Sequence, residues 1–125
     1  MPKILIADDE PHIRLLMEQT LEDVEDEGVE LLIAKDGEEA LEIIKSHKPD
    51  LVFLDVMMPK MSGFEVCYEV KVNLKISDIY IILLTAKGQE VDRLKGAEVG
   101  ADLYMTKPFN PDDVVSKARE IVFGK

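Results

Sequence analysis

The hydrophobic residues of this chain change their spacing repeatedly along the sequence, and this alternation limits the folds available to it. Five short runs are almost entirely apolar, which is typical of strands buried on both faces of a parallel sheet. These runs cover residues 3–7, 29–34, 51–54, 79–84 and 102–105. Each is followed by a segment whose apolar residues recur at helical spacing. The pattern predicts a doubly wound α/β domain with helices on both faces of a five-stranded parallel sheet.

Several predicted helices begin at sequences that favour helix initiation. Pro11 suits a first helical turn, and Asn110 followed by Pro111 supplies a capping residue and a proline at the first position. Asp36 and Gly37 open another helix, which ends before the proline at position 49. The inward faces predicted for the first and last helices consist of Ile13, Leu16, Met17, Leu21, Val24, Val114, Val115, Ala118, Ile121 and Val122.

Two further helices are predicted over residues 63–74 and 88–100. The second of these has a thin apolar stripe that includes Val91 and Leu94. Its interior Gly96 costs about 1 kcal/mol of helix stability relative to alanine. We therefore expect residues 88–100 to form the least stable helix of the domain, which suits a segment that changes conformation.

Length and charge exclude several classes of protein. The chain of 125 residues fits one domain, and its 15 basic and 26 acidic residues give a net charge of −11. Such a charge repels phosphate backbones and anionic lipids, so we expect no direct binding to nucleic acid or membranes. A single cysteine and the absence of a long apolar stretch indicate a cytoplasmic protein without disulfides.

Polar side chains follow the predicted strands where ligands bind in open parallel sheets. Asp8 and Asp9 follow the first strand, Asp55 the third, Thr85 the fourth and Lys107 the fifth. Three adjacent carboxylates require a proton or a cation, and oxygen ligands favour Mg²⁺ or Mn²⁺. A carboxylate can attack phosphorus, while an amine and a hydroxyl stabilise the transferred charge. The set therefore predicts metal-dependent phosphorylation of Asp55.

A few residues are expected to serve the structure alone or as well. Asp9 also suits the capping position of the first helix. His12 and His47 are predicted to lie on the surface, and Cys67 to fill space in the core. Met57 is expected to pack or to shape the loop that follows Asp55.

In order along the chain, these segments are similar to the receiver domain of bacterial response regulators in two-component signalling, and close to the stand-alone chemotaxis type. The matching segments are residues 4–10, 50–59, 61–63, 84–86 and 104–109. The resemblance covers essentially the whole chain and implies the strand order 2-1-3-4-5. Because the chain ends just after the last predicted helix, residues 1–125 are expected to form one receiver domain with no output domain.

The resemblance implies specific roles at the phosphorylation site. Asp55 corresponds to the phosphate acceptor, Asp9 to a direct Mg²⁺ ligand and Asp8 to a residue that acts partly through water. The backbone carbonyl of Met57 corresponds to the third protein ligand. Lys107 corresponds to the amine that pairs with the phosphoryl group.

The resemblance also implies a conformational switch. Thr85 corresponds to a hydroxyl that moves toward the phosphoryl group, and Tyr104 to an aromatic side chain that fills the vacated space. The peptide bond between Lys107 and Pro108 corresponds to a cis bond. The expected partners are a histidine kinase or phosphotransfer protein and a downstream protein that reads the face formed by the helix at 88–100, the fifth strand and the last helix. A monomer is expected, with phosphorylation-dependent dimerisation left open.

In this signalling role the chain is expected not to be an enzyme that acts on other substrates. Three alternative functions remain to be weighed against it. A haloacid dehalogenase-type phosphatase needs a second aspartate two residues after its nucleophile, where this chain has Met57. A flavodoxin needs a Ser/Thr/Gly-rich phosphate loop after the first strand, where this chain has Asp8, Asp9 and Glu10. A purely structural interaction module would show no dependence on Mg²⁺.

Overall fold

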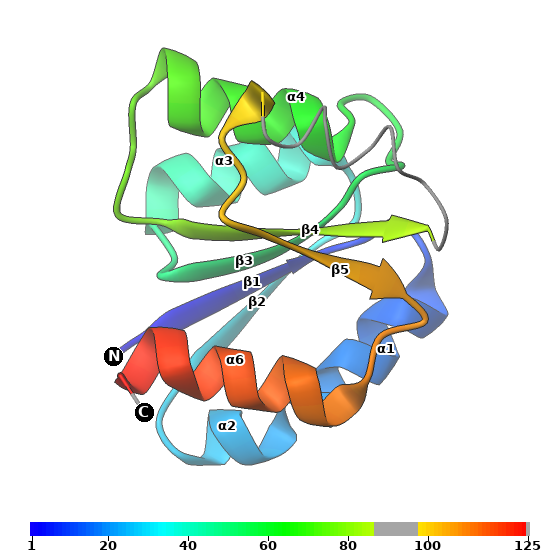
Figure 1. Ribbon diagram of the computed structural model, residues 1–125, viewed down its shortest axis with the longest axis vertical. Helices are drawn as coiled ribbons and strands as arrows, with labels where there is room; N and C mark the ends of the chain where they lie inside the picture. Colours follow the sequence, from blue (N-terminus) through cyan, green and yellow to red (C-terminus); the bar gives the residue numbers. More distant parts are fainter. Residues whose placement is uncertain (87–97, 125) are drawn as a thin grey trace.

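The computed structural model describes residues 1–86 and 98–124, and its strands form one parallel sheet in the order β2-β1-β3-β4-β5 (Figure 1). The strands are β1 (Lys3–Ala7), β2 (Glu30–Ala34), β3 (Leu51–Asp55), β4 (Tyr80–Ala86) and β5 (Leu103–Lys107). Both the doubly wound α/β class and the strand order expected from the resemblance are confirmed. The predicted ends differ slightly, because β4 continues beyond residue 84 and β5 beyond residue 105.

The register of the sheet brings the carboxyl ends of its strands to one edge. Ala7 of β1 pairs with Leu54 of β3, and Asp55 pairs with Leu84 of β4. On the other side of β4, Ala86 pairs with Lys107. Residues that are distant in the sequence therefore end their strands side by side, at the place predicted for the functional site.

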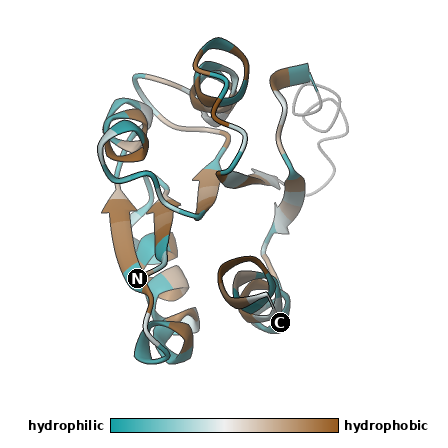
Figure 2. Ribbon diagram, turned by 90° about the vertical axis from the view of Figure 1, so that its left-hand side faces the viewer, coloured by the Kyte–Doolittle hydropathy of each residue, from teal (hydrophilic) through white to brown (hydrophobic). Residues whose placement is uncertain are grey.

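Helices cover both faces of the sheet (Figure 2). The helices among the described residues are α1 (Pro11–Thr20), α2 (Glu22–Asp26), α3 (Gly37–His47), α4 (Gly63–Tyr68), the π-helix η1 (Glu69–Asn73) and α6 (Pro111–Phe123). Helices α1, α2 and α6 lie on one face, and α3 and α4 lie on the other (Figure 1). Among the described residues, none of the helices has the length and apolar character that crossing a bilayer requires.

The core consists of two layers because alternate strand residues point to opposite faces of the sheet. In β1, Ile4 and Ile6 belong to the cluster that includes residues of α1 and α6, whereas Leu5 and Ala7 belong to the cluster under α3 and α4. All five residues of β3 are buried. This central position places the last residue of β3, Asp55, inside the molecule.

The first predicted helix differs from the observed structure in two respects. It is divided at Leu21 into α1 and α2. Leu16, predicted to face inward, is 43% exposed. The buried side of α1 is set by Met17 and Ile13, which are four residues apart, and Leu16 is turned about 100° from Met17 around the helix axis. That rotation places Leu16 beside the buried stripe rather than within it.

The predicted helix over residues 88–100, with Val91, Leu94 and Gly96, lies largely outside the described residues. Of this segment, the structure describes Val99, which is buried, and the flanking Glu98 and Gly100. Its expected conformational change therefore stays a prediction.

Candidate functional site

Asp55 is a buried carboxylate at the carboxyl end of β3. Its side chain is 4% exposed, because β1 and β4 flank it in the sheet. The loop that follows is held close to it: the Met57 backbone N–H donates a hydrogen bond of 3.3 Å to Asp55 Oδ1. The Met57 side chain is 77% exposed, so it does not pack in the core as one interpretation of the sequence held. The role of its backbone carbonyl as a metal ligand stays a prediction.

Three acidic residues from the β1–α1 loop meet Asp55. Carboxylate oxygens of Asp8, Asp9, Glu10 and Asp55 all lie within 4.8 Å of one another. Two hydrogen bonds between backbone and side-chain groups hold the loop in place. The Glu10 backbone N–H donates to Asp8 Oδ1 at 2.9 Å, and the Arg14 side chain donates to the Asp8 carbonyl at 2.7 Å. Asp8 and Asp55 are buried, whereas Asp9 and Glu10 are exposed. The tertiary structure thus brings the predicted Asp8, Asp9 and Asp55 into one cluster, together with Glu10, which was not predicted to belong to the site.

Asp9 does not cap the first helix, which corrects that part of the sequence analysis. The N-cap residue of α1 is Glu10, and no side chain makes a capping hydrogen bond there. The helix begins one residue later than Asp9 would require, because Pro11 occupies the first position. The Asp9 carboxylate instead belongs to the acidic cluster.

Lys107 reaches the same cluster from the end of β5. Its Nζ lies 3.0 Å from Asp55 Oδ1, 3.1 Å from Asp8 Oδ2 and 3.6 Å from Glu10 Oε1. The peptide bond between Lys107 and Pro108 is cis. One ammonium therefore faces three carboxylates at the edge of the sheet.

Burial and charge alter the protonation of these groups. Burial, together with the neighbouring charge of Asp8, raises the pKa of Asp55 to about 7, although Lys107 acts in the opposite direction. Burial alone would lower the pKa of Lys107, but its close contacts with the negative charges of Asp55 and Asp8 outweigh burial and raise it. Counting only the part of the chain that the structure describes, the site carries more negative than positive charge.

The donor set of this cluster suits a hard divalent cation. Asp8 Oδ2 is fully buried and has no hydrogen-bond partner among the described residues, although the Lys107 ammonium lies near it. All the side-chain donors in the cluster are carboxylate oxygens, which Mg²⁺ prefers over nitrogen or sulfur ligands. Within the described residues, four carboxylates beside one ammonium leave an excess of negative charge that a divalent ion would neutralise.

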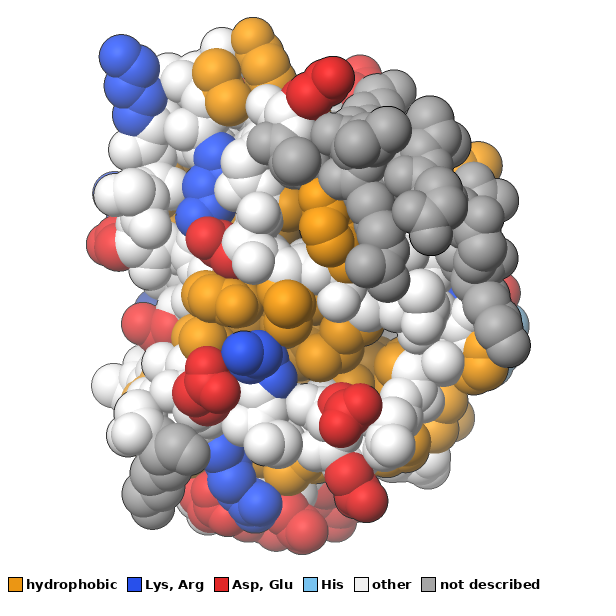
Figure 3. All heavy atoms as spheres, in the orientation of Figure 1, with side chains coloured by type: hydrophobic (Ala, Val, Ile, Leu, Met, Phe, Trp, Pro, Cys, Tyr) orange, Lys and Arg blue, Asp and Glu red, His pale blue; other side chains and the backbone are white. Residues whose placement is uncertain are grey.

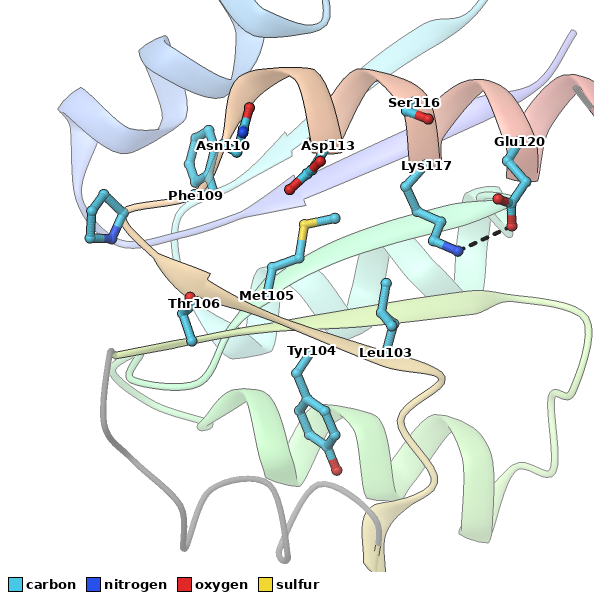
Figure 4. A pocket seen from close by; sticks show the side chains of 11 residues that line it. Leu103, Tyr104, Met105, Thr106, Phe109, Asn110, Asp113, Ser116, Lys117 and Glu120 are labelled. Carbon is cyan, nitrogen blue, oxygen red and sulfur yellow. Dashed lines mark hydrogen bonds and ion pairs between the residues drawn. The ribbon is translucent and has the colours of Figure 1, made fainter.

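The two predicted switch residues lie on adjacent strands. Thr85 is 2% exposed and pairs with Thr106 in the β4–β5 register. Tyr104 is partly buried and packs against the core cluster under α3 and α4. Its ring extends from β5 on the side away from α6 (Figure 4). Thr85 pairs with the residue before Lys107, and Tyr104 lies on the same strand as Lys107. The motion expected for these two side chains stays a prediction.

Two glycines that the sequence analysis did not assign to the site allow its loops to approach closely. A Cβ atom on Gly63 would collide with the backbone carbonyl of Asp55, and one on Gly37 would collide with that of Met61. Ser62 and Glu65 form a capping box that starts α4 directly after this loop. The Ser-Gly sequence was visible, but only the tertiary structure identifies what Gly63 contacts.

The two histidines and the single cysteine lie where the sequence predicted them. His12 and His47 are exposed, and Cys67 is buried. Burial raises the pKa of the Cys67 thiol to about 12, and its Sγ donates to the Val99 carbonyl at 3.4 Å. His12 also lies 3.4 Å from a carboxylate oxygen of Glu10.

A groove of about 630 Å³ runs between β5 and α6 (Figure 4). Its floor includes Leu103 and Met105 from the strand, and its wall includes Asp113, Lys117 and Glu120 from the helix. Figure 3 shows hydrophobic side chains gathered on this face with charged side chains around them. The groove lies on two of the three elements that the sequence analysis assigned to partner binding.

Comparison with protein families identifies one match that spans almost the whole domain. Residues 4–119 match the family model described as the response regulator receiver domain. A probable transcriptional regulator, ycf27, from Cyanophora paradoxa is 48% identical over 120 residues, which are 96% of this chain and 48% of that protein. The alkaline phosphatase synthesis transcriptional regulatory protein PhoP of Bacillus subtilis is 44% identical over 120 residues, which are 96% of this chain and 48% of PhoP. The chain spans about half the length of the curated relatives it matches.

Solved structures agree with this match. The Vibrio cholerae chemotaxis protein CheY4 is similar with a TM-score of 0.83 and 33% identity, over 97% of this chain and 98% of that one. The response regulator DrrB of Thermotoga maritima, an OmpR/PhoB homolog, is similar with a TM-score of 0.84 and 31% identity. That match covers 99% of this chain and 54% of DrrB.

Proposed function

This chain belongs to the response regulator receiver domain family of two-component signalling, and from that premise we propose that Asp55 is its phosphate acceptor. The proposed reaction requires Mg²⁺, or Mn²⁺ in its place. The chain acts as a signalling switch and catalyses only its own phosphorylation and dephosphorylation.

One observation carries the proposal more than any other. Asp55, Asp8 and Lys107 come from three different strand ends, yet the ammonium lies about 3 Å from both carboxylates. Such a cluster supplies a nucleophile, ligands for a cation and a fixed positive charge within one small site. The phosphatase alternative loses support because the position two residues after Asp55 is a methionine.

The proposed cation ligands are Asp8, Asp9, Asp55 and the backbone carbonyl of Met57. When bound, the cation supplies positive charge beside the transferred phosphoryl group. The buried position of Asp8 and Asp55 strengthens their interaction with any cation, because little water competes there.

Asp55 must be ionised to act as a nucleophile. A carboxylate oxygen of Asp55 forms a bond to phosphorus, and the bond from phosphorus to the donor breaks with its electron pair leaving on the donor. The expected donor is the phosphohistidine of a histidine kinase or phosphotransfer protein. Lys107 stabilises the negative charge of the product, and later attack by water restores the Asp55 carboxylate.

The signal is proposed to pass from the site to β5. Thr85 moves toward the phosphoryl group and Tyr104 fills the space that it leaves, which shifts an existing equilibrium between two conformations. Tyr104 and Lys107 share β5, so a change at the site alters the same strand that lines the groove beside α6. A downstream partner reads this face, in the cytoplasm.

The type of output is proposed from the relatives. The curated relatives at 44–48% identity are described as transcriptional regulators, whereas the chemotaxis protein is 33% identical. This difference favours control of transcription, exerted through a partner or a further domain rather than through direct contact of these acidic residues with DNA.

The test is incubation with acetyl phosphate and Mg²⁺, followed by measurement of the intact mass. We expect one added phosphoryl group, lost when EDTA is present and lost in Asp55→Ala. Asp78→Ala is the matched control, because Asp78 is an exposed aspartate outside the cluster. An unchanged adduct in Asp55→Ala would contradict the proposal, and rapid multiple turnover of a chromogenic phosphate ester would favour the phosphatase.

A further inference from the structure

The Lys107 ammonium contacts three carboxylates, and one of them, Glu10, has no role in the reaction proposed above. The distances are 3.0 Å to Asp55, 3.1 Å to Asp8 and 3.6 Å to Glu10. Asp8 and Asp55 are also proposed cation ligands. The ammonium and the cation therefore depend on the same two buried carboxylates.

Glu10 differs from Asp8 and Asp55 in its exposure and in its place in the fold. Its side chain is 48% exposed, against 0% for Asp8 and 4% for Asp55. It is the N-cap residue of α1, yet its side chain makes no capping hydrogen bond. One of its oxygens faces Lys107, and the other lies 3.4 Å from His12. The Glu10 carboxylate therefore lies at the rim of the pocket and does not cap helix α1.

A divalent cation beside Asp8 and Asp55 would repel the ammonium and neutralise much of the charge that holds it. Glu10 lies outside the proposed ligand set, so its charge remains available to Lys107. The hydrogen bond from its backbone N–H to Asp8 keeps Glu10 next to the pocket, and its exposed side chain is free of the packing that fixes Asp8.

We propose that Glu10 is a positioning residue that retains the Lys107 ammonium at the rim of the pocket when a divalent cation binds. The inference rests on the proposed function, because it assumes that the cation binds at Asp8, Asp9 and Asp55. Glu10 then favours cation binding in two ways: through its own charge, and by giving the displaced ammonium a partner. Only the second contribution depends on Lys107.

The test is a double-mutant cycle on Mg²⁺ affinity, measured by calorimetry at constant ionic strength without any phosphoryl donor. The proteins are the unmodified chain, Glu10→Gln, Lys107→Met and the double variant. We expect Glu10→Gln to lower the Mg²⁺ association constant about tenfold when Lys107 is present and about threefold or less when it is methionine. Glu18→Gln, further along α1, makes the same change in net charge and should alter the constant less than about twofold.

Equal losses in both backgrounds would overturn the inference, because Glu10 would then act only as a negative charge. In that case Mg²⁺ would still bind and the proposed function would stand. An unmodified chain that bound no Mg²⁺ would overturn both the inference and the proposed cation site.

A second measurement requires no change at Lys107. In Mg²⁺-saturated protein, the side-chain ammonium of Lys107 should give an exchange-protected nitrogen signal by NMR, and Glu10→Gln should remove that protection. Protection that persisted in Glu10→Gln, with Mg²⁺ still bound, would overturn the inference.

Discussion

The Asp55 carboxyl group lies where burial and the negative charge of Asp8 both oppose its ionisation. Its pKa is raised from 3.8 to about 7, with burial as the main cause and Asp8 as the next. Lys107 relieves only part of this conflict, since it is shared with two other carboxylates. A site that is unfavourable when empty gains stability from any cation that enters it.

This conflict predicts an unusual pH dependence for the cation-free protein. Between about pH 4 and pH 7 the folded chain binds more protons at Asp55 than the unfolded chain does, so the free energy of unfolding falls as pH rises. With EDTA present, it should fall by about 1–3 kcal/mol more between pH 5 and pH 8 than it does in Asp55→Asn. Urea unfolding at the two pH values measures the difference.

The shifted pKa values of Asp36 and Lys107 do not interfere with the comparison between pH 5 and pH 8. The lowered pKa of Asp36 affects stability only toward acid pH, and the raised pKa of Lys107 only in alkali. Asp78→Asn is the charge-matched control and should keep the slope of the unmodified protein. The same slope in Asp55→Asn as in the unmodified protein would contradict the assignment to Asp55.

At the scale of elements, α4 and its continuation η1 connect the two ends of the sheet. Helix α4 begins beside the Asp55 carbonyl, where Gly63 allows close contact. At the other end, η1 carries Lys71, whose Nζ lies 2.8 Å from Asp102 and also donates to the Ile79 carbonyl. The π-helical turn closes with the Leu74 N–H donating to the Glu69 carbonyl at 2.8 Å. This helical segment therefore contacts the site loop and the turn that leads into β5.

The close approach at Gly63 predicts that a single methyl group damages the site. Gly63→Ala must displace the backbone of Asp55 or the start of α4, so we expect a loss of about 1–3 kcal/mol of stability and slower phosphorylation by acetyl phosphate. Thermal unfolding and the rate of adduct formation measure both effects. Gly28→Ala is a control without a collision, although its positive φ adds strain of its own. Unchanged phosphorylation in Gly63→Ala would contradict the prediction.

The Lys71–Asp102 ion pair is predicted to contribute to the stability of the fold. The Lys71 side chain is only 10% exposed, and Asp102 also accepts a hydrogen bond of 2.8 Å from the Ile81 N–H. Asp102→Asn leaves the ammonium without its counter-charge, so we expect a loss of about 2–4 kcal/mol by urea unfolding. Adding Lys71→Met should restore part of this loss. A double variant less stable than Asp102→Asn would argue against a paired charge.

At the scale of the whole molecule, the fold gathers four acidic side chains into one cation-sized site. The chain carries a net charge of −11, and four of its carboxylates meet at the carboxyl edge of the sheet. The parallel register concentrates them there, because every strand ends at the same edge. Cation binding is therefore expected to stabilise the entire domain and not only the loops that hold the ligands.

Mg²⁺ at about one hundred times its dissociation constant should stabilise the domain by about 2.7 kcal/mol. The thermal midpoint measures this effect, with NaCl of equal ionic strength as the control for general screening. Asp9→Asn should reduce the Mg²⁺ effect, whereas Glu18→Asn, at an acidic residue outside the cluster, should not. An equal shift with NaCl alone would indicate screening of surface charge rather than a cation site.

The alternation of strands and helices could be predicted from the order of the residues, because burial on both faces of a sheet imposes continuous apolar runs and burial on one side of a helix imposes a period. The sequence also indicated that Asp8, Asp55 and Lys107 end their strands at one edge. The order of the strands came from the family resemblance, since local patterns carry no information about which strands pair.

The contacts that these groups make with one another and with other residues depend on how the whole chain folds. The contact between Glu10 and Lys107, the pairing of Lys71 with Asp102 and the approach of Gly63 to Asp55 join segments whose separation along the chain has no regular period. Leu16 shows the same limit within one helix, because which apolar side chains are buried depends on the surface packed against them. Such contacts are set by distances across the folded molecule, and those distances arise only when all the elements pack together.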